Sequence, residues 1–261
     1  MHVGLKVWST NDFYWVPIRR LHGAGVFDFL ELFVVPDSDS HLSGWKSFGV
    51  PWVLHAPHAH AGLNMSLPGR LEENSRAVRS LEAYALELSP RAVIFHPGVD
   101  GTIEETVRQV ALLRKQYPAS FRDALIENKP AVGLKGEACL GSTPAEIKEL
   151  KQETTMGFCF DFGHAVCAAA TNALDPYDYC SAFLPLSPAM YHLSDGLVGS
   201  TQDQHLNLGG GNFDFAKIAE MLPGDAWVSL ETNKCSKQNL DDFQRDVEFF
   251  RKVIDANRSN K

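Results

Sequence analysis

Paired cysteines and long apolar runs are both missing from this 261-residue sequence. The five cysteines are an odd number and form no C-x-x-C pair, which is typical of reduced thiols in a cytoplasm. No stretch approaches the roughly 18 apolar residues of a membrane helix, and the N-terminus has no basic region followed by an apolar core. We therefore expect a soluble, cytoplasmic protein without a signal peptide or a membrane partner.

Positive charge is also scarce. The 24 Lys and Arg residues are outnumbered by 32 Asp and Glu residues, and the net charge of −8 argues against nonspecific binding to nucleic acid. Low-complexity tracts are absent, so disorder is expected only in a polar tail from about residue 257. No linker marks a boundary, and a single domain over residues 1–261 is predicted.

Apolar segments of strand length alternate with amphipathic helical segments along the whole chain, which is typical of β/α units around a parallel sheet. Eight such units can be counted. Eight units in a chain of this length predict an α/β fold, the (β/α)8 TIM barrel. The predicted strands are His2–Trp8, Asp28–Val35, Pro51–His55, Arg91–His96, Asp123–Glu127, Gly157–Asp161, Ala189–Leu193 and Ala226–Glu231.

Residues of the kinds that bind metals follow the predicted strands at their ends. Because the catalytic groups of such barrels lie at the carboxyl ends of the strands, we expect these side chains to meet. Six successive strands, the third to the eighth, end this way, and an Asp-x-His pair follows the seventh. In an extended segment the two outer side chains of that pair point to the same face and can share one ion. The residues are His55, His58, His96, Glu127, Asp161, His164, His192, Asp195, Asp203, His205 and Glu231.

The order of these motifs resembles the endonuclease IV branch of the xylose-isomerase-like barrels. The resemblance covers nearly the whole chain and implies hydrolysis of a phosphate ester by a cluster of three zinc ions, two of them bridged by Glu127. The matching segments are His55-Ala-Pro, His96-Pro-Gly, Glu127-Asn128, Asp161-x-x-His164, His192-x-x-Asp195, Asp203-x-His205 followed by Leu-Gly-Gly-Gly, and Glu231. The implied ligands are His55, His96, Glu127, Asp161, His164, His192, Asp203, His205 and Glu231.

Five imidazoles and four carboxylates suit zinc better than magnesium, and they would also accommodate manganese or iron. Clustered divalent ions can clamp a phosphodiester, activate a bridging water and stabilise the departing alkoxide. We therefore expect Glu127 and Glu231 to act in catalysis. Asp195 is expected to assist them by orienting a ligating histidine.

The loop after the third predicted strand departs from the endonuclease IV pattern. It runs from His55 through His58 to Asn64, is longer than in that branch and lacks the aromatic residue that enters DNA. If Asn64 anchors the loop, His58 takes the ligand position; otherwise His55 does. The first two loops also lack a basic, aromatic surface for DNA. The expected substrate is therefore either abasic-site DNA or a small sugar or phosphate compound.

A second interpretation is a sugar or sugar-phosphate isomerase or epimerase. The two glutamates, Glu127 and Glu231, would move protons on and off a carbon next to a carbonyl while one ion polarises the oxygens. The segment around Glu31 resembles this branch, with Glu31 as a sugar contact. The Asp203-x-His205 pair exceeds what a single metal needs. The positions shared with this branch are Glu127, Asp161, His192 and Glu231.

Overall fold

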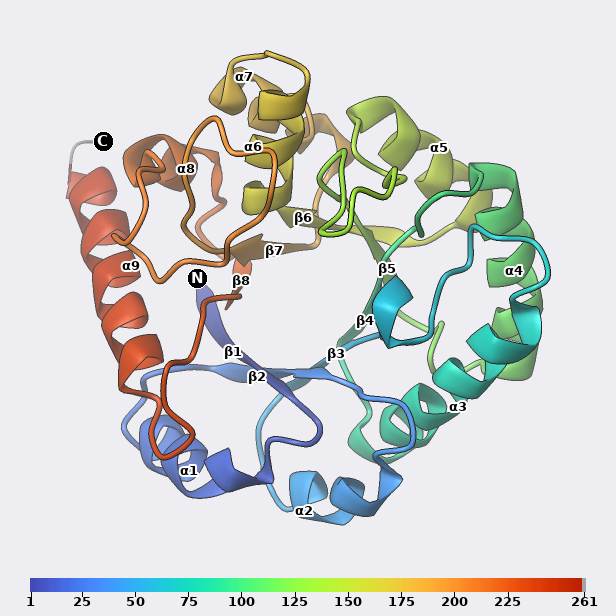
Figure 1. Ribbon diagram of the computed structural model, residues 1–261. Coiled ribbons are helices and arrows are strands. Elements are labelled where there is room, and N and C mark those ends of the chain that lie inside the picture. Colours follow the sequence, from blue (N-terminus) through green and yellow to red (C-terminus); the bar gives the residue numbers. More distant parts are fainter. Residues whose placement is uncertain (260–261) are drawn as a thin grey trace.

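All eight predicted strands form, and they close into one barrel. Each strand pairs in parallel with its successor, and β1 pairs with β8 to complete the ring. The structure is a computed structural model that describes residues 1–259, and Figure 1 shows the strands surrounded by helices. The predicted (β/α)8 barrel is confirmed. The strands are β1 (His2–Trp8), β2 (Phe29–Phe33), β3 (Trp52–His55), β4 (Ala92–Phe95), β5 (Ala124–Glu127), β6 (Gly157–Asp161), β7 (Met190–Leu193) and β8 (Trp227–Leu230).

Helices follow the strands and cover the outer face of the barrel (Figure 1). None of the helices in residues 1–259 combines the length and the apolar character that a bilayer crossing requires. The helices are α1 (Trp15–Gly23), α2 (Leu42–Lys46), α3 (Leu71–Leu88), α4 (Ile103–Gln116), α5 (Pro144–Thr154), α6 (Phe162–Thr171), α7 (Pro176–Ser181), α8 (Phe215–Met221) and α9 (Asp241–Ser259). Short 3-10 turns are η1 (Asp12–Tyr14), η2 (Asp39–His41), η3 (Ala59–Ala61) and η4 (Leu184–Leu186).

The C-terminal helix corrects one expectation. α9 continues to Ser259, through the first residues of the segment predicted to be a disordered tail, and the rest of that segment, residues 260 and 261, lies outside the described residues. Its buried side chains Phe243, Val247 and Phe250 recur three and four residues apart and fasten the helix to the barrel. This apolar stripe holds the amphipathic helix, and the polar residues after it continue the helical turn.

The barrel interior begins, at the amino-terminal ends of the strands, with a layer of apolar side chains. Phe29, Val53, Leu125 and Met190 belong to one buried cluster there. Gly4 of β1 makes room for this lower layer, because a Cβ atom at that position would lie 2.2 Å from Cζ of Phe29. A larger apolar core fills the space between the strands and the helices. The lower layer therefore closes the barrel beneath the polar residues.

Polar side chains form the upper layer, two residues further along the same strands. Side chains alternate between the two faces of a strand, so a residue two positions after an inward-facing residue also faces inward. The lower and upper residues of each pair are Gly4 and Lys6, Phe29 and Glu31, Val53 and His55, Leu125 and Glu127, Cys159 and Asp161, and Met190 and His192. The upper layer lies at the carboxyl end of the barrel, where the sequence predicts the site.

Candidate metal centre

Nine of the ten predicted metal ligands meet at the carboxyl end of the barrel. They form overlapping groups in which one ligand atom from each residue lies within 4.8 Å of the others. Glu31, which was not predicted as a ligand, joins one group. The groups are Glu31, His55, His192 and Glu231; His55, His96 and Glu127; His164, Asp203 and His205; and Glu127, Asp161 and His164.

His55, His96 and Glu127 form what we call the inner group. Oε2 of Glu127 lies 3.0 Å from Nε2 of His55 and 3.1 Å from Nε2 of His96. Nδ1 of His55 donates to the carbonyl oxygen of Ala56 at 2.8 Å. A neutral His55 therefore carries its lone pair on Nε2, facing the same space as the carboxylate.

His164, Asp203 and His205 form the outer group, which lines the barrel mouth. Oδ2 of Asp203 lies 2.8 Å from Nε2 of His205 and 3.3 Å from Nε2 of His164. Nδ1 of His205 donates to the carbonyl of Glu231, and Nδ1 of His164 donates to that of Asn128, both at 2.8 Å. His205 has a φ of 47°, a strained backbone region for a non-glycine residue that is characteristic of functional sites.

The ring orientations of these histidines fit a metal centre. His55, His164 and His205 each donate Nδ1–H to a main-chain carbonyl, which leaves Nε2 free to bind an ion. Within residues 1–259, Oδ2 of Asp203 is buried without an aligned hydrogen-bond partner, although Nε2 of His205 and Nε2 of His164 lie 2.8 and 3.3 Å away. Such atoms are costly to bury unless an ion or another partner satisfies them. The residues therefore fit divalent ions held by nitrogen and oxygen ligands.

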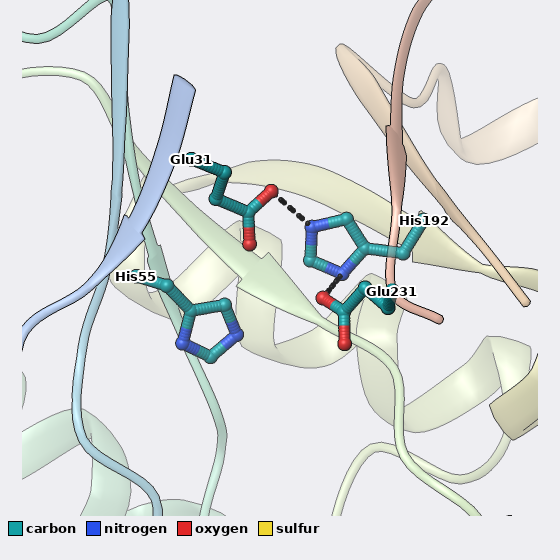
Figure 2. Close-up of side chains that lie close together, drawn as sticks. All are labelled: Glu31, His55, His192 and Glu231. Carbon is teal, nitrogen blue, oxygen red and sulfur yellow. Dashed lines mark hydrogen bonds and ion pairs between the residues drawn. The ribbon is translucent and has the colours of Figure 1, made fainter. Parts of the chain in front are cut away.

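His192 lies between two glutamates (Figure 2). Its Nε2 donates to Oε2 of Glu31 at 2.9 Å, and its Nδ1 lies 2.6 Å from Oε1 of Glu231. Lys6 completes this cluster, because its Nζ donates to Glu231 and lies 3.0 Å from Oε1 of Glu31. Glu31, which the resemblance to the isomerases implies as a sugar contact, is thus fully buried between His192 and Lys6.

Lys6 was not predicted as a site residue. The signal that could have found it is a lysine within an apolar strand, two residues after Gly4, whose inward position follows from the alternation of β1. Burial lowers the pKa of Lys6, but Glu231 and Glu31 more than offset this and raise it. Burial raises the pKa of Glu31, yet His192 and Lys6 bring it down to about 2. Lys6 and Glu31 therefore form a charged pair inside the barrel.

Two histidines of the centre have opposite protonation preferences. Burial and the nearby Lys129 ammonium hold the pKa of His96 well below its ordinary value. Burial also lowers the pKa of His164, but Asp161 and the other carboxylates around it raise it to about 10. His96 is therefore already neutral and can bind an ion directly, whereas His164 must release a proton first.

The structure places His55, and not His58, in the cluster. His58 lies outside the four ligand groups, and its ring centre is 5.4 Å from that of Phe33 on the cavity wall. Asn64 does anchor the loop, because its Oδ1 accepts from the main-chain N–H of Val99 at 3.1 Å. The anchor nevertheless leaves His58 out of the centre, because His55 ends β3 and points into the barrel.

Asp195 does not take the expected role. Its carboxylate accepts hydrogen bonds from the main-chain N–H groups of Gly196, Gly209, Gly211 and Phe213, at 2.8 to 3.2 Å. It makes no hydrogen bond to a histidine of the described chain, residues 1–259, so the prediction that it orients a ligating histidine was wrong. Asp195 instead holds both ends of the loop that carries Asp203 and His205, because four N–H donors occupy its oxygens.

Comparison with known proteins identifies the family. A sequence profile of the xylose isomerase-like TIM barrels matches residues 27–253. The chain belongs to this family. An uncharacterized protein of Methanocaldococcus jannaschii is 23% identical over 232 residues, which cover 80% of this chain and 71% of that protein.

Several solved structures share the fold. A D-tagatose 3-epimerase-like protein superimposes with a TM-score of 0.71 at 20% identity. The superposition covers 100% of this chain and 99% of the epimerase-like chain. Endonuclease IV from Thermus thermophilus superimposes with a TM-score of 0.68, also at 20% identity. This superposition covers 98% of this chain and 100% of the endonuclease chain. The two chemistries considered from the sequence are thus both represented among proteins of the same architecture.

The mouth of this xylose isomerase-like barrel holds a cavity of about 610 Å³. Lys129 lines it, with Nζ 3.3 Å from Nε2 of His164. Lys234 also lines it, and burial lowers the pKa of this lysine to about 8. Trp8 and Phe13 add apolar surface and are 52% and 41% exposed. The cavity therefore combines the ligand groups with positive charge and an apolar rim.

Proposed function

We propose that this chain is a divalent-metal-dependent hydrolase of phosphate esters, with zinc as the preferred ion and manganese or iron as substitutes. The observation that carries the proposal is the outer group of His164, Asp203 and His205. Two of its rings are held by main-chain carbonyls with Nε2 toward Asp203. An isomerase that works around one metal does not need this group, whereas hydrolysis by a metal cluster does.

The residues of the centre have different roles in this reaction. When bound, divalent ions neutralise phosphate oxygens and make water a better nucleophile. Glu127 fixes the spacing of the two groups, because its Oε2 faces His55 and His96 while its Oε1 lies 3.0 Å from Nδ1 of His164. Lys129, 3.3 Å from His164, supplies a positive charge that can hold a phosphate oxygen.

The cavity supports a small substrate. Its volume of about 610 Å³ lies within the range of roughly 300–1,000 Å³ that is typical of small-molecule sites. Lys129, Lys234 and Lys237 line it and complement a negatively charged ester, and Trp8 and Phe13 can contact the rest of the molecule. The net charge of −8 opposes a polyanionic DNA duplex. We therefore propose a sugar phosphate or a similar small phosphate ester, and abasic-site DNA is the alternative to be tested.

Isomerisation or epimerisation of a sugar or sugar phosphate is the second candidate. The likeness to the D-tagatose 3-epimerase-like protein favours it, and so do the positions of Glu127 and Glu231. These carboxylates lie 3.6 and 2.6 Å from Nδ1 of His192, so both could exchange protons with one bound substrate. Lys6 opposes this role, because its ammonium already engages Glu231.

Metal counting and product analysis on the same protein test the proposal. The protein is stripped of metal, reloaded with Zn²⁺ and compared with an Asp203→Ala/His205→Ala double variant. We expect the double variant to bind one ion fewer and to lose phosphate release from small phosphate esters. The matched control is Asp12→Ala/His41→Ala, which removes an Asp–His pair of 3.4 Å outside the cavity lining and should change neither quantity.

Ketoses, their phosphates and an abasic-site duplex are assayed alongside the phosphate esters. Nicking of the duplex would keep the hydrolase but replace the small substrate. Phosphate release that is undiminished in the double variant contradicts the proposal. Epimerised or isomerised sugar as the sole product assigns the second candidate instead.

A further inference from the structure

Lys6 is a buried positive charge among the ligand groups. Its side chain is 13% exposed, and those of its partners Glu31 and Glu231 are 0% and 8% exposed. Nζ donates to Oε1 of Glu231 and lies 3.0 Å from Oε1 of Glu31. Taking an ammonium out of water is costly, and it is tolerated only where its counter-charges stay close. The contacts therefore hold Lys6 in place.

The position of Lys6 coincides with one of the four ligand groups. Glu31, His55, His192 and Glu231 bring ligand atoms within 4.8 Å of one another, and Figure 2 shows Glu31 and Glu231 on opposite sides of the His192 ring. Nζ of Lys6 contacts both carboxylates of this group. A metal ion bound to the same oxygens would lie only a few ångströms from the ammonium, where like charges repel strongly in a buried site. The group has room for one cation.

We propose that the Lys6 ammonium is the fixed cation of this group and takes the place of a metal ion there. This assignment rests on the proposed metal-dependent function and specifies how many ions that function uses. Two ions bind, one in the inner group and one in the outer group, instead of the three that the resemblance to endonuclease IV implies. The remaining group, Glu127, Asp161 and His164, adds no separate ion, because it shares Glu127 with the inner group and His164 with the outer group. Glu31 is then a positioning residue, because it holds both Lys6 and His192.

The number of bound ions tests this assignment directly. Metal-free protein is loaded with Zn²⁺, desalted, and its zinc content per chain is measured by mass spectrometry. We expect two ions in the unchanged protein and three in Lys6→Met, because methionine leaves the carboxylates of Glu31 and Glu231 to a divalent ion. The matched control Lys6→Arg keeps the positive charge and should bind two.

Lys6→Met leaves two buried carboxylates without their counter-charge and can fail to fold. The double variant Lys6→Met/Glu31→Gln removes the excess charge, and His192 and Glu231 should still take an additional ion. Circular dichroism establishes that each counted variant is folded. Three ions in the unchanged protein, or no additional ion in either folded variant, overturns the assignment.

These outcomes are separate from those of the proposed function. A protein that binds two ions, gains a third in the Lys6 variants and releases no phosphate from any ester retains the role of Lys6 and contradicts the hydrolase. A protein that binds three ions and releases phosphate retains the hydrolase and contradicts the role of Lys6.

Discussion

The barrel interior has two layers of side chains, which lie two residues apart along the strands. The lower layer is apolar and the upper layer is polar and charged. In β5 the step leads from Leu125 to Glu127, and in β7 it leads from Met190 to His192. The lower layer stabilises the fold by burying apolar surface. The upper layer buries charges, which costs free energy that only mutual pairing or bound ions can offset. Stability and chemistry are therefore separated along each strand, and variants that affect one layer should spare the other.

The largest effect is expected in the lower layer. Met190→Ala should lower the free energy of unfolding by about 2–5 kcal/mol, because it leaves a cavity in a closed apolar cluster. The zinc content of the folded variant should not change. Urea denaturation of the metal-free protein measures the first quantity and metal analysis the second. Loss of an ion without loss of stability would show that the layers are not independent.

The corresponding change in the upper layer should weaken metal binding. Glu127→Gln keeps the size of the side chain but removes the charge that faces His55, His96 and His164. Its zinc affinity should fall by at least about 100-fold, since even residues that only orient ligands contribute 10–100-fold. Competition with a chromogenic chelator measures the affinity. An affinity within threefold of that of the unchanged protein corresponds to a difference in binding free energy of at most about 0.65 kcal/mol. Such a result would exclude Glu127 as a ligand.

The loop that carries Asp203 and His205 lies outside both layers. Its stability should depend on Asp195, which accepts hydrogen bonds from both of its ends. Asp195→Asn places an amide against N–H groups that need acceptors, and it should cost about 1–3 kcal/mol of stability. It should also reduce zinc at the outer group and leave the inner group loaded, because Asp203 and His205 belong to the supported loop. Denaturation and metal counting measure these effects. Full zinc content in a destabilised variant would mean that the outer group does not depend on Asp195.

The smallest effect concerns pH. Because the pKa of Lys234 is lowered to about 8, this lysine is protonated below pH 8 and loses its positive charge above it. The KM for an anionic ester should therefore rise by about two- to fivefold across this pH, equivalent to about 0.5–1 kcal/mol for one partly exposed charge. In Lys234→Arg the guanidinium stays charged, and this rise should disappear. A rise that persists in the arginine variant assigns the titration to another group.

Local patterns in the sequence were sufficient for the barrel and for most of the centre. Strand alternation and the common direction of the strands bring residues such as Glu127 and His192 to one end without any knowledge of loops. The pairing of Lys6 with Glu31 was not predicted, because it depends on the register between β1 and β2, which places the two residues opposite each other. The role of Asp195 depends on N–H groups as distant as Phe213, and no spacing rule connects them.

Three histidine rings of the centre, those of His55, His164 and His205, are held by main-chain carbonyls of Ala56, Asn128 and Glu231. Every residue type supplies such a carbonyl, so the orientation of these three rings depends on the path of the chain and not on the identity of the neighbouring side chains. Cavity-lining residues such as Trp8 and Phe13 can therefore be exchanged while the ligand geometry persists. An enzyme arranged in this way can evolve, or be engineered, toward new substrates by mutation of its rim alone.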